Sequence, residues 1–120
     1  MDFDETEDQT MIRDIVRDFA ETVAGPSCHQ RDKEQRPPID EFKEFAGLGF
    51  AGMTISEKYG GQKLDDISEA IVIEELSRVD PSLGVMVAVH VGLCSMTIAL
   101  NGTEEQKKKC LPKLASGEYL

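Results

Sequence analysis

Histidines, cysteines and paired acidic residues are the side chains of this sequence that could bind a metal or carry out acid–base chemistry. Cys28 and His29 are adjacent, and no second pair accompanies them at the spacing that a zinc site requires. Glu74 and Glu75 are also adjacent, and neighbours on a helix point about 100° apart. That geometry favours capping or surface groups over a catalytic pair. We therefore expect neither a catalytic residue nor a metal site in this chain.

The glycine pair Gly60-Gly61 is the one place where the sequence could hold a phosphate group. A phosphate-binding loop follows a strand and continues into a GK[ST] motif, and neither feature is present here. A glycine pair in an aperiodic stretch more simply indicates a tight turn with a positive φ. We therefore expect no cofactor-binding residue.

His90 lies in the middle of a long apolar stretch, and two interpretations of it remain open. It could be a core histidine bonded to a backbone carbonyl, or it could line a cavity. On a helix, the residues three or four positions away share its face, and here they are apolar or weakly polar. Such a row would suit a pocket for an acyl chain. We predict a substrate-binding surface formed by Met86, Val87, His90, Leu93 and Cys94.

The elements that would position these residues are helices. Residues 6–25 form an amphipathic helix that begins with a capping box at Thr6 and ends at Gly25-Pro26. Its predicted inward side chains are Met11, Ile12, Ile15, Val16, Phe19, Ala20 and Val23. Further helices are predicted over 27–35, 39–49, 65–80, 81–100 and 103–114. No segment alternates with a period of two, so we expect no sheet.

Residues 81–100 are apolar on nearly all sides, which suits either a membrane span or a helix in the centre of a bundle. Ser82, His90, Ser95 and Thr97 interrupt the run, and no basic residues flank it, so we favour the core helix. The predicted fold is all-α: a bundle of about five to six helices around a buried apolar central helix 81–100, in one domain spanning 1–120.

Composition narrows the partners and the compartment. The formal net charge of −10 disfavours nucleic acid and an anionic membrane surface, because both are bound through Lys and Arg. An odd number of cysteines, three, is typical of reduced thiols. The acidic N-terminus has neither a basic signal region nor an Arg-rich transit sequence. We expect a bacterial cytoplasm, or a mitochondrial matrix after removal of a presequence.

Three stretches, taken together, resemble a known family. "EKYGGQKLD" at 57–65, "EELSRVDPSLGVMVAVHVGL" at 74–93 and "NGTEEQKKKCLPKLASGE" at 101–118 are similar in order and spacing to the N-terminal helical domain of the flavin-dependent acyl-CoA dehydrogenases. "GLGFAGM" at 47–53 and the opening helix also match. One departure falls at Val91-Gly92, where the family often has an Asn-Ser pair. This leaves the preferred length and branching of the acyl chain open.

The resemblance implies a larger flavoenzyme. Family members dehydrogenate the α and β carbons of an acyl-CoA, using FAD and a catalytic glutamate in a C-terminal helical domain, and pass electrons to an electron-transferring flavoprotein. They are usually homo-oligomers. The resemblance also implies that 84–94 borders the acyl pocket. The β domain and the C-terminal domain would follow Leu120, so this chain alone would lack the catalytic base, bind no FAD and be inactive.

Two alternatives stay open on the sequence. The chain could be a free-standing helical binding module without enzyme activity. It could also belong to an acyl-CoA oxidase-like member of the superfamily that reacts with oxygen, since nothing in these residues separates that chemistry from a dehydrogenase.

Overall fold

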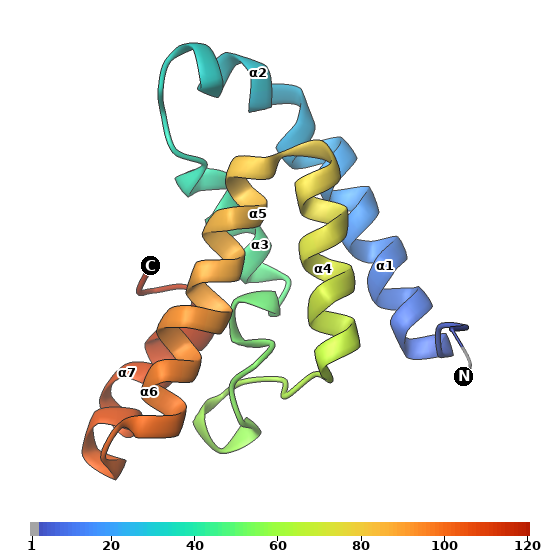
Figure 1. The fold of residues 1–120 in the computed structure, drawn as a ribbon. Helices are drawn as coiled ribbons and strands as arrows, with labels where there is room; N and C mark the ends of the chain where they lie inside the picture. The colour runs from blue at the N-terminus through green and yellow to red at the C-terminus, as the bar shows by residue number, and fades with distance from the viewer. Residues whose placement is uncertain (1–2) are drawn as a thin grey trace.

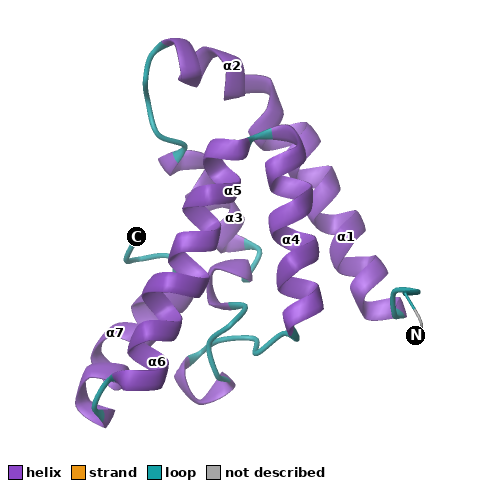
Figure 2. Cartoon of the chain, viewed as in Figure 1, coloured by secondary structure: helices purple, strands orange, loops and turns teal. Residues whose placement is uncertain are grey.

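The computed structural model describes residues 3–120 and is helical throughout, with no strand in that part of the chain (Figures 1 and 2). The predicted all-α class is therefore confirmed. The elements are α1 (Glu7–Phe19), η1 (Ala20–Ala24), α2 (Gly25–Lys33), α3 (Ile39–Gly47), η2 (Phe50–Gly52), η3 (Glu57–Tyr59), α4 (Asp66–Val79), α5 (Pro81–Ala88), η4 (Val89–Ser95), α6 (Met96–Asn101) and α7 (Glu104–Ser116). Of the short elements, η1 and η4 are π-helical and η2 and η3 are 3₁₀-helical.

Helix α1 begins with the predicted capping box. The Thr6 hydroxyl accepts a hydrogen bond from the Gln9 backbone, and the Gln9 side chain accepts one from the Thr6 backbone. The helix lies against α4 (Figure 1). The predicted inward face is too wide, because Met11 and Ile15 are exposed and the core takes the residues from Val16 onward. A helix packed against a single neighbour buries a narrower stripe than one surrounded by others.

The first helix was expected to end at Gly25-Pro26, but the structure continues it. The chain stays helical through the π turn Ala20–Ala24 and into α2, which runs at an angle to α1 (Figure 1). The Gly25 N–H donates to the carbonyl of Ala20, five residues back. A π turn followed by a proline is a usual cause of a kink, so these residues bend the helix without stopping it.

The core lies where α1, α3, α4 and α5 meet. Phe42 and Phe45 of α3 are fully buried, and Phe45 stacks with Phe50 and contacts Phe19. Leu48 lies at the end of α3 and is exposed.

Elements α5, η4 and α6 follow one another without a break and form one long helix, Pro81–Asn101, which we call the long helix. Asp80 caps it by accepting a hydrogen bond from the Leu83 backbone. Its length and mean hydropathy of 2.1 would also suit a membrane span, but Leu83, Val87 and Val91 are part of the protein core. The predicted burial holds for one face only, and another face leaves an apolar row exposed: Val85, Val89 and Leu93.

Glu75 corrects the expectation that the two adjacent glutamates are capping or surface groups. Glu74 is exposed, but Glu75 is buried in the interface between α1 and α4. Its carboxylate accepts hydrogen bonds from Arg13 at 2.6 Å and from Arg17 at 2.8 and 3.0 Å. The ion pairs therefore fasten α1 to α4 alongside their apolar contacts.

The segment 50–64 connects α3 to α4 and is held by its own backbone. The N–H groups of Gln62, Lys63 and Leu64 donate to carbonyls at Gly52, Ile55 and Met53. Gly60 has the predicted positive φ, at 86°. Gly61 lies so close to this segment that a Cβ atom there would be 1.9 Å from the Ile55 carbonyl oxygen.

Helix α7 packs against the long helix and segment 50–64 and completes the fold. It begins with a capping box at Thr103 and Gln106, at the start of the helix predicted over 103–114. It ends at Gly117, whose φ of 78° is the left-handed conformation that closes many helices.

Candidate functional site

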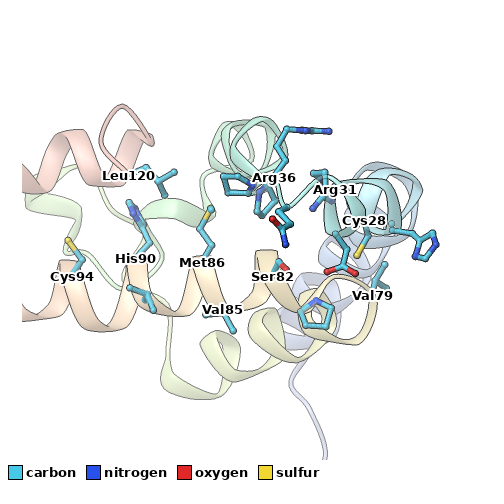
Figure 3. Close-up of a pocket in the computed structure, with 18 residues that line it drawn as sticks. Cys28, Arg31, Arg36, Val79, Ser82, Val85, Met86, His90, Cys94 and Leu120 are labelled. Carbon is cyan, nitrogen blue, oxygen red and sulfur yellow. The ribbon is translucent and has the colours of Figure 1, made fainter.

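An open groove of about 1410 Å³ lies between α2, the loop after it, and the long helix. Its apolar wall is formed mainly by Pro37, Pro38, Val79, Val85, Met86, Val89 and Leu120. Polar side chains gather at the α2 end, where His29, Asp32 and Arg36 line it. Figure 3 shows this arrangement, with Met86 and His90 projecting from the long helix on the side where Leu120 lies.

Of the five predicted site residues, the structure brings three together along this groove. Met86, His90 and Cys94 all line it. Val87 is fully buried in the core, and Leu93 is 68 % exposed on another face of the helix. The expectation that all five share a face is therefore wrong.

The reason lies in the π turn Val89–Ser95, which no sequence signal had indicated. In a regular α-helix, residues three and four apart share a face. A π turn uses more residues per turn, because its hydrogen bonds span five residues instead of four. Positions four apart therefore stay aligned with His90, while Val87 and Leu93, three apart from it, are turned onto neighbouring faces.

His90 satisfies both interpretations that the sequence left open. Its side chain is almost fully buried, and Nε2 lies 2.9 Å from the carbonyl oxygen of Leu114 on α7. Because that oxygen can only accept, Nε2 carries a proton and donates it. Phe42 meets the ring edge-on, with centroids 4.9 Å apart. Burial lowers the pKa of His90, so the imidazole is neutral near pH 7. His90 thus joins the long helix to α7 and also lines the groove.

A buried ionic cluster supports the α2 end of the groove, and sequence analysis did not find it. Arg31 of α2 is buried and donates to Asp80 at 2.7 Å, to Glu41 at 3.0 Å and to the Ala24 carbonyl at 2.9 Å. Asp80 is itself fully buried. The sequence signal was Asp80-Pro81, which indicates a helix start but not a buried partner 49 residues away. This cluster fixes α2 over the junction of α4 and α5.

Glu41 belongs to the same cluster. Burial alone would raise the pKa of its carboxyl, but hydrogen bonds from its own backbone, from Ser27 and from Arg31 outweigh burial and lower it. Its Oε2 atom is buried without a hydrogen-bond partner. The side-chain hydrogen bonds from Ser27 and Arg31 are therefore both accepted by Oε1.

The groove offers binding rather than reaction chemistry. Burial and the nearby Asp80 carboxylate raise the pKa of the Cys28 thiol, which disfavours the nucleophilic thiolate. Within residues 3–120, no three His, Cys, Asp or Glu side chains are grouped as metal ligands would be. What remains is an apolar wall with a neutral imidazole in it.

The turn at Gly60-Gly61 does not offer a cradle for the phosphates of a dinucleotide cofactor. The glycine pair is the candidate, and its backbone groups are already used: the Gly60 N–H donates to Glu57 and the Gly61 N–H to Ser56. A phosphate would find no free donor at this turn.

The fold and the site define an all-helical domain with a groove, apolar on one wall, along a capped central helix. The profile described as "Acyl-CoA dehydrogenase, N-terminal domain" matches residues 6–118. The chain belongs to the acyl-CoA dehydrogenase family and matches its N-terminal helical domain, as the sequence resemblance indicated.

Individual relatives support the same family assignment. The short-chain-specific acyl-CoA dehydrogenase of Clostridium acetobutylicum is 41 % identical over 120 residues, which is all of this chain and 32 % of the relative. Butyryl-CoA dehydrogenase from Megasphaera elsdenii superposes with a TM-score of 0.90 at 32 % identity, covering 100 % of this chain and 32 % of that one. The chain thus spans about a third of the length of these relatives.

Two other solved structures bear on cofactor and partner. A chain from the work on the electron transferring flavoprotein of Acidaminococcus fermentans has a TM-score of 0.94 and 40 % identity, covering 100 % of this chain and 32 % of that chain. An acyl-CoA dehydrogenase from Bacillus anthracis was solved in complex with FAD and has a TM-score of 0.85 at 36 % identity, covering 98 % of this chain and 20 % of that chain. Structural relatives of this chain thus include an FAD-bound flavoenzyme.

Proposed function

We propose that this chain supplies one wall of the acyl pocket in a flavin-dependent dehydrogenase that oxidises the α,β-carbon bond of an acyl-CoA thioester. The observation that carries the proposal is the row Met86, His90 and Cys94 along the apolar wall of the groove, in a chain that matches the N-terminal domain of that family. Residues 84–94 are the stretch in which the sequence resemblance places the border of the acyl pocket.

The contribution of these residues is shape and exclusion of water. Met86 is flexible and adapts to an apolar chain. His90 has its Nε2 proton committed to Leu114, so the neutral ring adds a wall without a charge. A dry wall beside a thioester strengthens the electrostatic interactions that act on it.

We place the catalytic base and the flavin outside this chain. Among the described residues that line the groove, the carboxylate is that of Asp32, which lies exposed at its polar end. The relatives extend to about three times the length of this chain, and the exposed apolar row Val85, Val89 and Leu93 is a surface on which further chain could pack. The partners proposed for the whole enzyme are acyl-CoA, FAD, an electron-transferring flavoprotein and further copies of itself, in a bacterial cytoplasm or a mitochondrial matrix.

The test is to purify the complete product of the gene and to assay it with a series of saturated acyl-CoA substrates. We expect a yellow protein whose flavin is reduced by an acyl-CoA, and we expect residues 1–120 alone to bind no flavin. A colourless 13.3 kDa protein that unfolds cooperatively and oxidises no acyl-CoA would instead support the free-standing binding module. Reoxidation by oxygen as fast as by an electron-transferring flavoprotein would support the oxidase-like alternative.

The groove itself is tested by filling it. Met86→Phe places a larger side chain on the groove wall and should lower kcat/KM for the longer acyl-CoA substrates about tenfold relative to the shorter ones. Leu93→Phe is the matched control, because Leu93 is 68 % exposed on the same long helix and does not line the groove. Equal chain-length profiles for Met86→Phe and the unmodified enzyme would contradict the assignment of the groove.

A further inference from the structure

The long helix follows a period of four rather than 3.6 over its central part. Four of its buried residues, Leu83, Val87, Val91 and Ser95, are fully buried and lie four positions apart; Gly84 and His90 are buried as well. Val85, Val89 and Leu93 form an exposed row, of which Val85 and Val89 also line the groove, and Met86, His90 and Cys94 form a second row along the groove. In a regular α-helix each step of four residues turns the direction of the side chain by about 40°, so a row of four would rotate by about 120°. The π turn Val89–Ser95 removes this drift.

Two buried hydroxyls bond to carbonyl groups inside that π turn. Ser95 Oγ donates to the carbonyl oxygen of His90 at 2.7 Å. Thr54 Oγ1 donates to the carbonyl oxygen of Val91 at 2.8 Å. Both bonds are shielded from water, since Ser95 is fully buried and Thr54 is 8 % exposed. A wide turn disturbs the regular α-helical hydrogen bonds, and hydroxyl donors at consecutive carbonyls stabilise the disturbed geometry.

Thr54 acts on the helix from a fixed position. It lies in segment 50–64, where the residues on either side of it, Met53 and Ile55, accept backbone hydrogen bonds at 2.7 and 3.0 Å from Leu64 and Lys63. Both neighbours are fully buried. The Thr54 hydroxyl therefore donates to the Val91 carbonyl from a position that is fixed by segment 50–64 and does not depend on η4.

We propose that Thr54 and Ser95 are positioning residues that hold the π turn and so decide which side chains of the long helix face the groove. Without the wide turn, the helix would return to about 100° per residue. Leu93 would then lie about 20° from the direction of Met86, and Cys94 about 80° away from it. Leu93 would enter the groove in place of Cys94. Because leucine is larger than cysteine, the groove would become shorter.

The consequence for substrates rests on the proposed function, but the consequence for geometry does not. In the complete enzyme, Thr54→Val combined with Ser95→Ala should lower kcat/KM for the longer acyl-CoA substrates relative to the shorter ones by about tenfold. The preference of the enzyme would thereby move toward shorter chains. A hydroxyl that merely stabilises the fold would lower the Tm and leave this ratio unchanged.

The experiment has two readouts on the same double variant. The first is the geometry, measured by a crystal structure. We expect Leu93 to line the groove in place of Cys94. The second is the acyl-CoA profile. Ser116→Ala is the matched control, because Ser116 also donates to a helix carbonyl, that of Lys113, but far along the exposed surface of α7.

The outcomes separate the two ideas. A double variant that keeps the π turn and keeps Cys94 on the groove wall overturns the positioning role. Changed geometry with an unchanged acyl-CoA profile supports the positioning role and contradicts the acyl groove. If the double variant does not fold, the single variants decide, together with Thr54→Ser, which keeps the hydroxyl. A Thr54→Ser protein with Leu93 in the groove overturns the proposal, and one that keeps Cys94 there while Thr54→Val loses it supports the proposal.

Discussion

Replacing Glu75 by glutamine should destabilise the fold strongly at neutral pH and much less in acid. Glu75 is 2 % exposed and accepts hydrogen bonds from two arginines of α1, so Glu75→Gln removes the negative charge while keeping the shape of the side chain. The variant leaves Arg13 and Arg17 without their buried partner. Both arginines are partly exposed and can turn toward water, which limits the damage to the loss of the pair itself.

The magnitude follows from the acidity of the carboxyl. Hydrogen bonds from Arg17 and Arg13, opposed in part by burial, lower the pKa of Glu75 from its ordinary 4.5 to about 2. Each unit of pKa corresponds to about 1.4 kcal/mol, so the ionised carboxylate stabilises the fold by about 3 kcal/mol. Because the pKa is lowered in the folded state, this stabilisation is complete above pH 4.5. It is lost as the pH falls from there toward 2, with about half remaining at pH 3.

The assay is urea denaturation of the chain and of Glu75→Gln at pH 7 and at pH 3, followed by circular dichroism. The difference in unfolding free energy should be about 3 kcal/mol at pH 7 and about half of that at pH 3. Glu74→Gln is the matched control, because Glu74 is 66 % exposed and its single ion pair should contribute less than about 1 kcal/mol. The reasoning is refuted if the two variants are equally stable at pH 7, or if the Glu75→Gln difference does not change with pH.

Three further variants test the fold. Gly61→Ala should cost several kcal/mol, because its Cβ would collide with the backbone at Ile55, whereas Gly47→Ala, where a Cβ meets no atom within 4 Å, should be neutral or slightly stabilising in the same thermal melt. Asp80→Asn should cost about 3–5 kcal/mol in urea, because the buried guanidinium of Arg31 loses a charged partner; a loss below 1 kcal/mol would show that the remaining carboxylate suffices. Thr103→Ala should cost about 1 kcal/mol through loss of the α7 cap, and unchanged hydrogen exchange in the first turn of α7 would contradict that.

Local signals in the sequence were sufficient for the start and end of most helices. The capping boxes at Thr6 and Thr103 and the terminal Gly117 are contained within a few residues, and the structure has all three. Asp65 caps α4 by accepting a hydrogen bond from the Ser68 backbone, so the helix predicted over 65–80 begins one residue later, at Asp66. Short-range rules identify an element well and its boundary to within a residue or two.

Long-range pairing was not accessible in the same way. The bond between Arg31 and Asp80 joins residues 49 positions apart, and the burial of Glu75 requires that α1 lie beside α4. The residue types arginine and glutamate do not indicate burial, since both are usually found at the surface. A charged residue on a helix becomes interpretable only when the facing helix is known.

The site shows a different limit, because the error there came from a rule that is correct for regular helices. A regular helix of 3.6 residues per turn places Leu93 near the direction of Met86. With the π turn, Cys94 lines the groove and Leu93 does not. The residues that cause the change are not in the groove: Ser95 faces the core, and Thr54 comes from a loop 37 residues before the carbonyl it bonds. If the positioning role holds, the shape of the groove depends on two buried hydroxyls as much as on the side chains that line it. An alignment restricted to groove residues would then misassign the lining wherever Thr54 or Ser95 is replaced by a residue without a hydroxyl, and the direction of the error is fixed, with Leu93 exchanged for Cys94.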